Sequence, residues 1–221
     1  MNKTTTIGLD LAKDVFHVVC CDARGKMVRK RMLKRSQVLT FFSNLERCLV
    51  GMEACASAHY WGRELEALGH EVKLIPAQYV KAFVRGNKND YNDALAIAEA
   101  VVRPEMRFVT IKTPEQQDIQ ALHRLRKGCV GMRTALCNQI RGLVGEYGLV
   151  APKGVAALRR RIPEWLEAGD NGLSDLFRRL LSESYVRLQE LDTHIVFYTE
   201  EVERQSKQDE ACQRLQTIPG F

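Results

Sequence analysis

The chain has 221 residues, of which 45% are hydrophobic and 27% charged, and its formal net charge is +6. This length and apolar content suit one α/β domain with an appended region better than two full domains. No segment approaches the roughly 20 apolar residues of a membrane span, and the first residues do not resemble a secretory signal. We therefore expect a cytoplasmic protein with no membrane partner.

Neither the seven cysteines nor the five histidines form a recognisable metal-binding or cross-linking pattern. The cysteines are odd in number, irregular in spacing and include no Cys-x-x-Cys pair. The histidines include no pair at helical spacing. The sequence thus favours neither a disulfide framework nor a structural zinc site.

The positive charge is concentrated in two segments. Residues 112–163 contain ten Lys or Arg and three acidic residues, a balance of +7, and residues 24–35 contain seven basic residues and no acidic one. Such runs are often solvated helix or strand faces, but clustered Lys and Arg also release counterions from a nucleic-acid backbone. We favour the second interpretation, a phosphate-binding surface.

The first three predicted elements are strands. Residues 5–11, 15–21 and 27–33 are apolar or β-branched runs, and residues 22–26 supply the turn between the last two. This arrangement is typical of a three-stranded antiparallel meander.

Helices and strands then alternate. Helices are predicted over residues 36–48, 58–70, 77–84 and 89–102, and strands over 49–53 and 71–75. We expect Ser36 to cap the first of these helices. Strands that are linked by helices pair in parallel. Residues 106–113 predict a last strand or an extended piece.

From Thr113 onward the pattern becomes helical over long stretches. Thr113 and Pro114 supply a capping residue and a proline at the first helical position, and a second long helix begins near Leu173. The expected apolar face of the first helix comprises Leu122, Leu125, Cys129, Met132, Leu136, Ile140, Leu143 and Tyr147, and that of the second Leu181, Ser184, Leu188, Leu191, Ile195, Tyr198 and Val202. Spacings of three and four are typical of a coiled coil, formed within one chain or with a second copy.

The segment between these two helices, residues 152–172, predicts a broken, basic connection. The chain as a whole then divides into an α/β domain over residues 1–112 and a helical coiled-coil region over residues 113–214.

Four acidic residues lie at strand ends or at the start of a helix. Such positions explain each residue separately, but they do not explain why four acids occur together. Asp10 interrupts the first strand, Glu53 ends the fourth, and Asp90 and Asp93 lie three apart in the first turn of a helix. Adjacent first and fourth strands would bring Asp10 and Glu53 side by side, and a later helix could place the other two acids against them. Converging carboxylates repel one another unless a hard divalent cation such as Mg²⁺ or Mn²⁺ joins them. Two such ions about 4 Å apart would suit phosphoryl transfer.

The motifs that carry these acids, IGLDLAKD, GMEACASAHYW and NKNDYNDALAIA, resemble those of the DEDD insertion-sequence transposases, relatives of the Piv DNA invertase. The third motif is the most specific. The resemblance implies an RNase H-like (RuvC-like) mixed sheet of about five strands with flanking helices. It also implies that Asp10, Glu53, Asp90 and Asp93 are catalytic ligands of Mg²⁺, for which Mn²⁺ can substitute, and that DNA and a structured guide (bridge) RNA are partners.

The end of the sequence, LQTIPGF (residues 215–221), resembles the start of that family's C-terminal transposase domain. In the family, a serine of that domain is the nucleophile, and no serine here matches its motif, so we assign none. We expect a truncated chain that does not complete strand exchange alone.

The helical region would, by the same resemblance, contribute nucleic-acid contacts and assembly into a homodimer or higher homo-oligomer. The candidate contacts are Arg124, Arg126, Lys127, Arg133, Arg141, Arg159, Arg160 and Arg161.

Two other functions remain open at this point. A RuvC-like nuclease that uses water as the nucleophile would need only the four acids. A non-catalytic scaffold would bind RNA or DNA and dimerise through its helices. An actin-like or sugar-kinase fold is disfavoured because Ala12 and Lys13 stand where such proteins place phosphate-binding residues.

Overall fold

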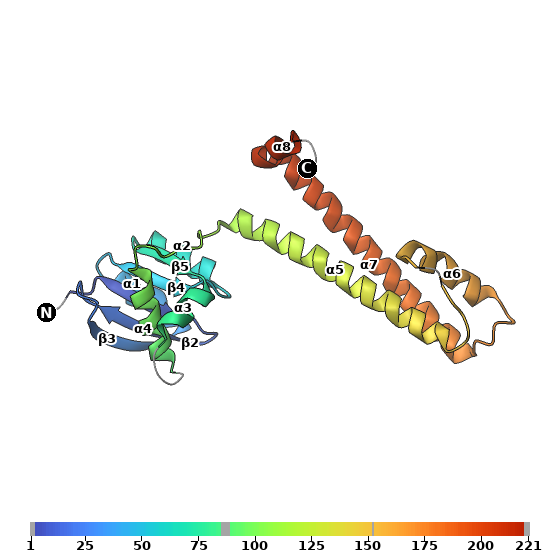
Figure 1. Cartoon of the computed structure of the whole chain (residues 1–221), viewed down its shortest axis with the longest axis horizontal. Helices are drawn as coiled ribbons and strands as arrows, with labels where there is room; N and C mark the ends of the chain where they lie inside the picture. The colour runs from blue at the N-terminus through green and yellow to red at the C-terminus, as the bar shows by residue number, and fades with distance from the viewer. Residues whose placement is uncertain (1–2, 85–88, 152, 219–221) are drawn as a thin grey trace. The chain divides into compact units, whose positions relative to one another are not determined.

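The computed structural model describes residues 3–84, 89–151 and 153–218. The chain forms two compact units, Met1–Thr113 and Pro114–Phe221 (Figure 1). No helix among the described residues is both long enough and apolar enough to span a membrane.

A five-stranded mixed sheet forms the centre of the first unit, with strand order β3-β2-β1-β4-β5. The strands are β1 (Thr6–Asp10), β2 (Val15–Cys21), β3 (Met27–Lys34), β4 (Leu49–Glu53) and β5 (Glu71–Ile75). The first three pair antiparallel, which confirms the predicted meander, and β4 pairs in parallel with both β1 and β5.

Helices cover both faces of this sheet. They are η1 (Arg35–Gln37), α1 (Val38–Ser43), α2 (Ala58–Ala67), α3 (Ala77–Val80), η2 (Lys81–Phe83) and α4 (Asp90–Val101). On one face Phe42 of α1 and Leu65 of α2 pack against Ile7 and Leu9. On the other face α4 packs Ala94 and Ala98 against β2. The fold is therefore the predicted α/β, RNase H-like one.

Helix α4 lies unusually close to the sheet because two glycines face it. A Cβ atom added to Gly8 of β1 would lie 1.8 Å from the carbonyl oxygen of Ala94, and one added to Gly51 of β4 would lie 2.8 Å from Cβ of Val101. Any side chain at these positions would push the helix away. The two glycines thus set the height of α4 above β1 and β4.

Several local predictions for this unit are wrong in their details. The segment after β3 starts with a 3-10 turn that includes Ser36, and Gln37 is the N-cap of α1. The helix ends at Ser43 because the side chains of Ser43 and Asn44 both donate to the carbonyl oxygen of Thr40.

Two further segments are shorter or less regular than expected. The predicted helix over residues 77–84 is divided into α3 and η2. Residues 106–113 are extended, and their β-pairing is limited to one bridge between Val109 and Leu74.

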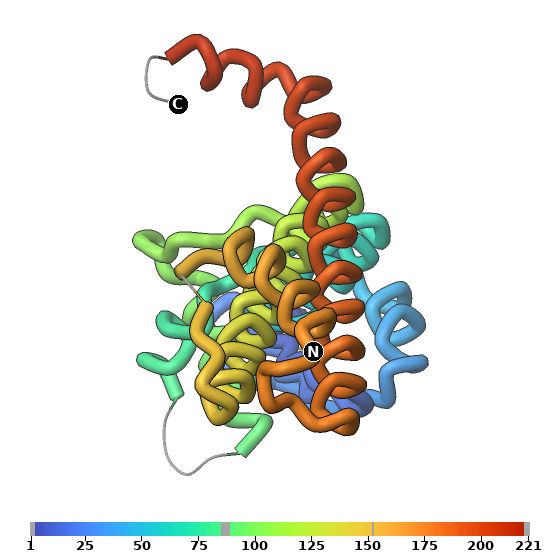
Figure 2. The backbone as a smooth tube through the Cα atoms, turned by 90° about the vertical axis from the view of Figure 1, so that its right-hand side faces the viewer, coloured from blue at the N-terminus to red at the C-terminus, as the bar shows by residue number. Residues whose placement is uncertain are grey.

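Among the described residues, the second unit is a helical hairpin with two additional helices. It contains α5 (Pro114–Gly145), α6 (Val155–Glu167), α7 (Asp175–Gln208) and α8 (Glu210–Gln216). Helices α5 and α7 run antiparallel, and α6 lies near one end of the hairpin (Figure 1). The view along the hairpin in Figure 2 shows the gold α6 beside the orange first part of α7, against which it packs. Residues 215–221 are predicted to begin a further domain. The last three of them, residues 219–221, lie outside the described residues.

The prediction of a broken connection is wrong, because residues 155–167 form α6 with Pro163 in its interior. A proline there removes one helical hydrogen bond. The amphipathic face made by Leu158, Ile162 and Trp165 is buried in the core of the unit, and this burial compensates for the loss.

The two long helices match their predicted faces to different extents. On α7, Leu181, Leu188, Leu191 and Ile195 are buried as expected. On α5, the predicted residues Leu125, Met132 and Leu143 are exposed, as is Tyr147 just after the helix, whereas Cys137 and Val144 are buried. Helix α5 contacts both α6 and α7, so its buried stripe is set by two partners rather than by one seam.

Candidate metal centre

The strand ends place Asp10 and Glu53 on the same face of the sheet. Asp10 is the last residue of β1 and Glu53 the last residue of β4, and these neighbouring strands are parallel. Side chains alternate along a strand, so Asp10 shares the face of Gly8, and Glu53 shares the face of Gly51. Both glycines abut α4. The two carboxylates therefore lie at the carboxyl edge of the sheet, on the side that α4 covers.

The first turn of α4 brings two further acids to this edge. The side chain of Asn89 accepts a hydrogen bond from the backbone N–H of Tyr91 at 2.9 Å, so the helix begins at Asp90. One carboxylate oxygen each of Asp10, Asp90 and Asp93 lie within 4.8 Å of one another. Residues 87 and 88 of the same motif lie outside the described residues.

Electrostatics confirm that these acids act on one another. The pKa of Asp10 is raised from 3.8 to about 6, chiefly by burial and then by the negative charges of Asp93, Asp90 and Glu53, in that order. Glu53 is outside the group of three whose oxygens are mutually close, but its charge still reaches Asp10. The structure thus brings three of the predicted acids together and places the fourth beside them.

The donor set is suited to a hard divalent cation. Three carboxylate oxygens from one strand and one helical turn offer the ligand type that Mg²⁺ and Mn²⁺ prefer. The raised pKa of Asp10 shows that the ionised cluster is electrostatically unfavourable by itself. A bound cation would relieve that repulsion, so the residues present fit such an ion.

One residue of this region was missed by the sequence analysis. His17 of β2 is directly opposite Asp10 in the antiparallel register, and its Nδ1 lies 3.6 Å from Oδ2 of Asp90. Strand alternation alone shows that His17 shares a face with Val19. Only the register between β1 and β2 shows that this face is that of the acids.

The predicted nucleic-acid contacts fall into two groups. Arg126, Arg133, Arg141 and Arg159 have hydrogen-bond partners within the helical unit, and Arg161 pairs with Glu164. Arg124, Lys127 and Arg160 are exposed.

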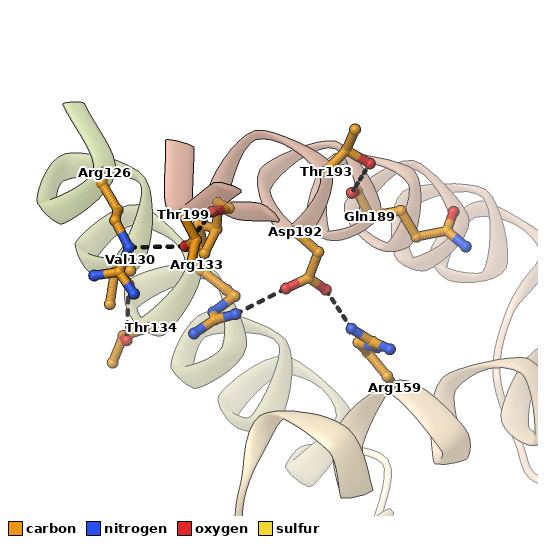
Figure 3. Close-up of polar contacts among 10 residues, drawn as sticks. Arg126, Val130, Arg133, Thr134, Arg159, Gln189, Asp192, Thr193 and Thr199 are labelled. Atoms are coloured by element: carbon orange, nitrogen blue, oxygen red, sulfur yellow. Dashed lines mark hydrogen bonds and ion pairs between the residues drawn. The ribbon is translucent and has the colours of Figure 1, made fainter. Parts of the chain in front are cut away.

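Figure 3 shows how the first group is used. Asp192 of α7 accepts from Arg133 of α5 at 2.9 Å and from Arg159 of α6 at 2.7 Å, so one carboxylate joins three helices. Nε of Arg126 donates to Oγ1 of Thr199 at 2.8 Å across the hairpin. These side chains hold the helices together, a role that a count of charges along the sequence does not reveal.

The comparisons with known proteins identify a family. The family described as "Transposase", the DEDD transposases of the IS110 type, matches residues 7–148. The chain is 45% identical to a probable family 20 transposase of Pseudomonas aeruginosa over 97% of this chain and 64% of that protein. It is 43% identical to the transposase for insertion sequence element IS1111A of Coxiella burnetii, over the whole chain and 60% of that protein.

A third relative, the transposase for insertion sequence element IS1328 of Yersinia enterocolitica, is 40% identical over the whole chain and 65% of its own length. The chain therefore spans less than two thirds of the length of these three relatives. The family match covers well over half of the chain and includes all four acidic positions. This chain belongs to the IS110 family of DEDD transposases.

Proposed function

We propose that this chain carries the metal-binding part of an insertion-sequence transposase that performs Mg²⁺-dependent phosphoryl transfer on DNA. The observation that carries the proposal is the cluster of Asp10, Asp90 and Asp93, whose carboxylate oxygens lie within 4.8 Å of one another in a chain of this family. Glu53, at the end of the neighbouring strand, completes the proposed ligand set.

The bound cation would supply Lewis-acid stabilisation of the charge on the phosphate oxygens. The chain would hold this cation by fixing the positions of the carboxylate ligands. Asp10 is held by strand pairing on both sides of β1, and Asp93 is held by a helix that rests on Gly8. Because these supports are regular backbone structure, the carboxylates are in place before substrate binds.

Manganese binding by the purified chain tests the ligand assignment directly. We expect the wild-type chain to bind Mn²⁺ in an electron paramagnetic resonance titration and the Asp10→Asn variant to lose that binding. Asp14→Asn is the matched control, because Asp14 is exposed and close in sequence but lies outside the cluster. Unchanged Mn²⁺ affinity in Asp10→Asn would contradict the proposal.

The reaction itself belongs to the longer protein in this proposal, because the family resemblance assigns the nucleophilic serine to a further domain. In a full-length relative, the variant that corresponds to Asp10→Asn should abolish DNA joining. Cleavage of branched or nicked DNA by the 221-residue chain would instead favour the nuclease alternative, with water as the nucleophile. Salt-dependent binding without any effect of divalent metal would favour the scaffold alternative.

We further propose that DNA and a structured guide RNA contact the helical unit through its exposed cations. Arg124, Lys127 and Arg160 support this role because their side chains are exposed. Each contact to a phosphate contributes about one unit to the slope of log K against log salt concentration. Arg160→Ala should therefore reduce this slope by about 1 for a structured RNA. Arg204→Ala, on an exposed residue that pairs with Glu201, is the control and should leave it unchanged.

Assembly into a homodimer or higher homo-oligomer is also proposed for the helical unit. The support is a set of large apolar side chains that α5 and α7 leave exposed: Leu125, Met132, Leu143, Leu176, Leu180 and Phe197. Met132→Lys should lower the mass of the particle measured by light scattering at a fixed protein concentration. Val150→Lys, at a position outside the helices, should leave the mass unchanged.

A further inference from the structure

His17 contacts the beginning of α4 in two ways. Its Nδ1 lies 3.6 Å from Oδ2 of Asp90, and its ring meets the ring of Tyr91 edge to face, with centroids 4.8 Å apart and an interplanar angle of 84°. The side chain of His17 is only 13% exposed, whereas that of Asp90 is 60% exposed. A well-packed ring on β2 thus touches the most solvent-exposed acid of the cluster.

Tyr91 has a second neighbour on the sheet. Nζ of Lys30 lies 5.0 Å from the centroid of the Tyr91 ring. Lys30 is on β3 and pairs with Val19, which is two residues after His17 on β2. Strand alternation places Lys30, Val19 and His17 on the same face of the sheet. The first turn of α4 is therefore supported by two strands that contribute no acid to the cluster.

The other acids of the cluster have support of a different kind. Asp10 is at the end of a paired strand, and Asp93 lies one turn into α4, next to Ala94, whose carbonyl oxygen meets Gly8. Asp90 is the first residue of the helix, and its side chain is exposed. His17 of β2 stands beside its carboxylate and, unlike Asp10, is not an acid.

From this arrangement we propose that His17 is a positioning residue for the metal site, which holds the carboxylate of Asp90 toward Asp10 and Asp93 through its Nδ1 atom. The proposal rests on the proposed function, because it assumes that these acids bind a divalent cation. Residues that orient metal ligands from outside the coordination shell change metal affinity by about 10-fold to 100-fold when they are removed. His17 has the location of such a residue.

Three substitutions separate the Nδ1 atom from the packing of the ring. His17→Phe keeps an aromatic ring against Tyr91 but removes both nitrogens. His17→Asn places an amide nitrogen near the position of Nδ1, and His17→Gln places one near the position of Nε2. His123→Phe is the matched control, on an exposed histidine of α5.

Mn²⁺ affinity of the purified chain is the readout, measured by paramagnetic resonance, with the thermal midpoint recorded for each variant. We expect His17→Phe and His17→Gln to bind Mn²⁺ about tenfold more weakly than the wild type, and His17→Asn and His123→Phe to stay within about threefold of it. If His17→Phe does not fold, the comparison of His17→Asn with His17→Gln still decides the question.

Two results would overturn the inference, and a third concerns the proposed function. Wild-type affinity in His17→Phe would show that Nδ1 has no role, and equal weakening in the Asn and Gln variants would show that the residue acts only through packing. In either case loss of binding in Asp10→Asn would leave the proposed function intact. Absence of Mn²⁺ binding in the wild-type chain would overturn both together.

Discussion

Asp192 and Asp10 are partly buried aspartates of the two units, and their surroundings are opposite. Asp192 lies between the guanidinium groups of Arg133 and Arg159, at 2.9 and 2.7 Å. Asp10 is surrounded by other carboxylates, and burial together with their charges raises its pKa to about 6. The first arrangement stabilises the fold that contains it, whereas the second opposes it. A cluster that weakens its own unit points to a function other than stability.

The largest effect is expected where the acidic cluster depends on close packing. Gly8→Ala would place a Cβ atom 1.8 Å from the carbonyl oxygen of Ala94, so either α4 or β1 must move. We expect the free energy of unfolding to fall by about 3 kcal/mol or more in urea denaturation. Gly128→Ala on α5 is the control, because no heavy atom lies within 4 Å of its added Cβ. There the helix should gain about 0.5–1 kcal/mol.

A Gly8→Ala variant with wild-type stability would show that α4 does not require close contact with β1. The acids would then be free to separate, and the contrast between the two units would lose its structural basis.

The paired aspartate should come next in magnitude. Asp192→Ala leaves Arg133, whose side chain is 26% exposed, without its carboxylate partner, and also removes the Arg159 ion pair between α6 and α7. A loss of about 2–3 kcal/mol is expected, since removal of one partner leaves a half-buried charge uncompensated. Glu164→Ala, which breaks only the exposed pair with Arg161, should change stability by less than about 0.5 kcal/mol. Equal losses of stability in the two variants would show that the ion pairs of Asp192 contribute no more than the exposed pair of Glu164 and Arg161.

Substitution of Asp10 should change stability in the opposite direction and raise it. The pKa of Asp10 is 3.8 in its ordinary state and about 6 in the fold, so the folded chain binds this proton more tightly than the unfolded chain does. Its contribution to stability is therefore present at low pH and lost as the pH rises from about 4 to about 6. Asp10→Asn should raise the thermal midpoint at pH 7.5 in the presence of a chelator. The difference should vanish near pH 3.5, and a lower midpoint at pH 7.5 would contradict this assignment.

The smallest effect concerns how strongly each neighbouring acid raises the pKa of Asp10. The charge of Asp93 raises its pKa more than that of Glu53 does. Asp93→Asn should therefore lower the pKa of Asp10 further than Glu53→Gln does, as followed by carboxyl chemical shifts in an NMR titration. A reversed order would place Glu53 closer to the centre of the cluster than the structure does.

The sequence predicted the acidic positions because each one ends an apolar run or begins a helix, and such local patterns are legible without tertiary information. The three-stranded meander, the parallel later strands and α4 followed from the same signals. His17 could not be found in this way, because its proximity to Asp90 depends on the register of β2 against β1. Register is set by the whole hairpin and not by the residues at either position.

The helical unit shows the same limit more strongly. Pro163 indicated a break, but burial of Ile162 and Trp165 against the hairpin preserves α6. Arg133 and Arg159 counted toward a basic surface until their common partner on α7 was known. In each case a residue from a distant element decides the outcome, and no spacing along the sequence records it.

The close seat of α4 on Gly8 and Gly51 has a consequence for the choice of ion. Because the carbonyl oxygen of Ala94 abuts Gly8, the separation between the backbones that carry Asp10 and Asp93 is set by the packing of α4 on β1. At the proposed metal site, ions of different radius would therefore meet two carboxylates whose backbone separation rotamer changes cannot alter. Redesign toward a larger cation would have to begin with the glycines beneath the helix, not with the carboxylates.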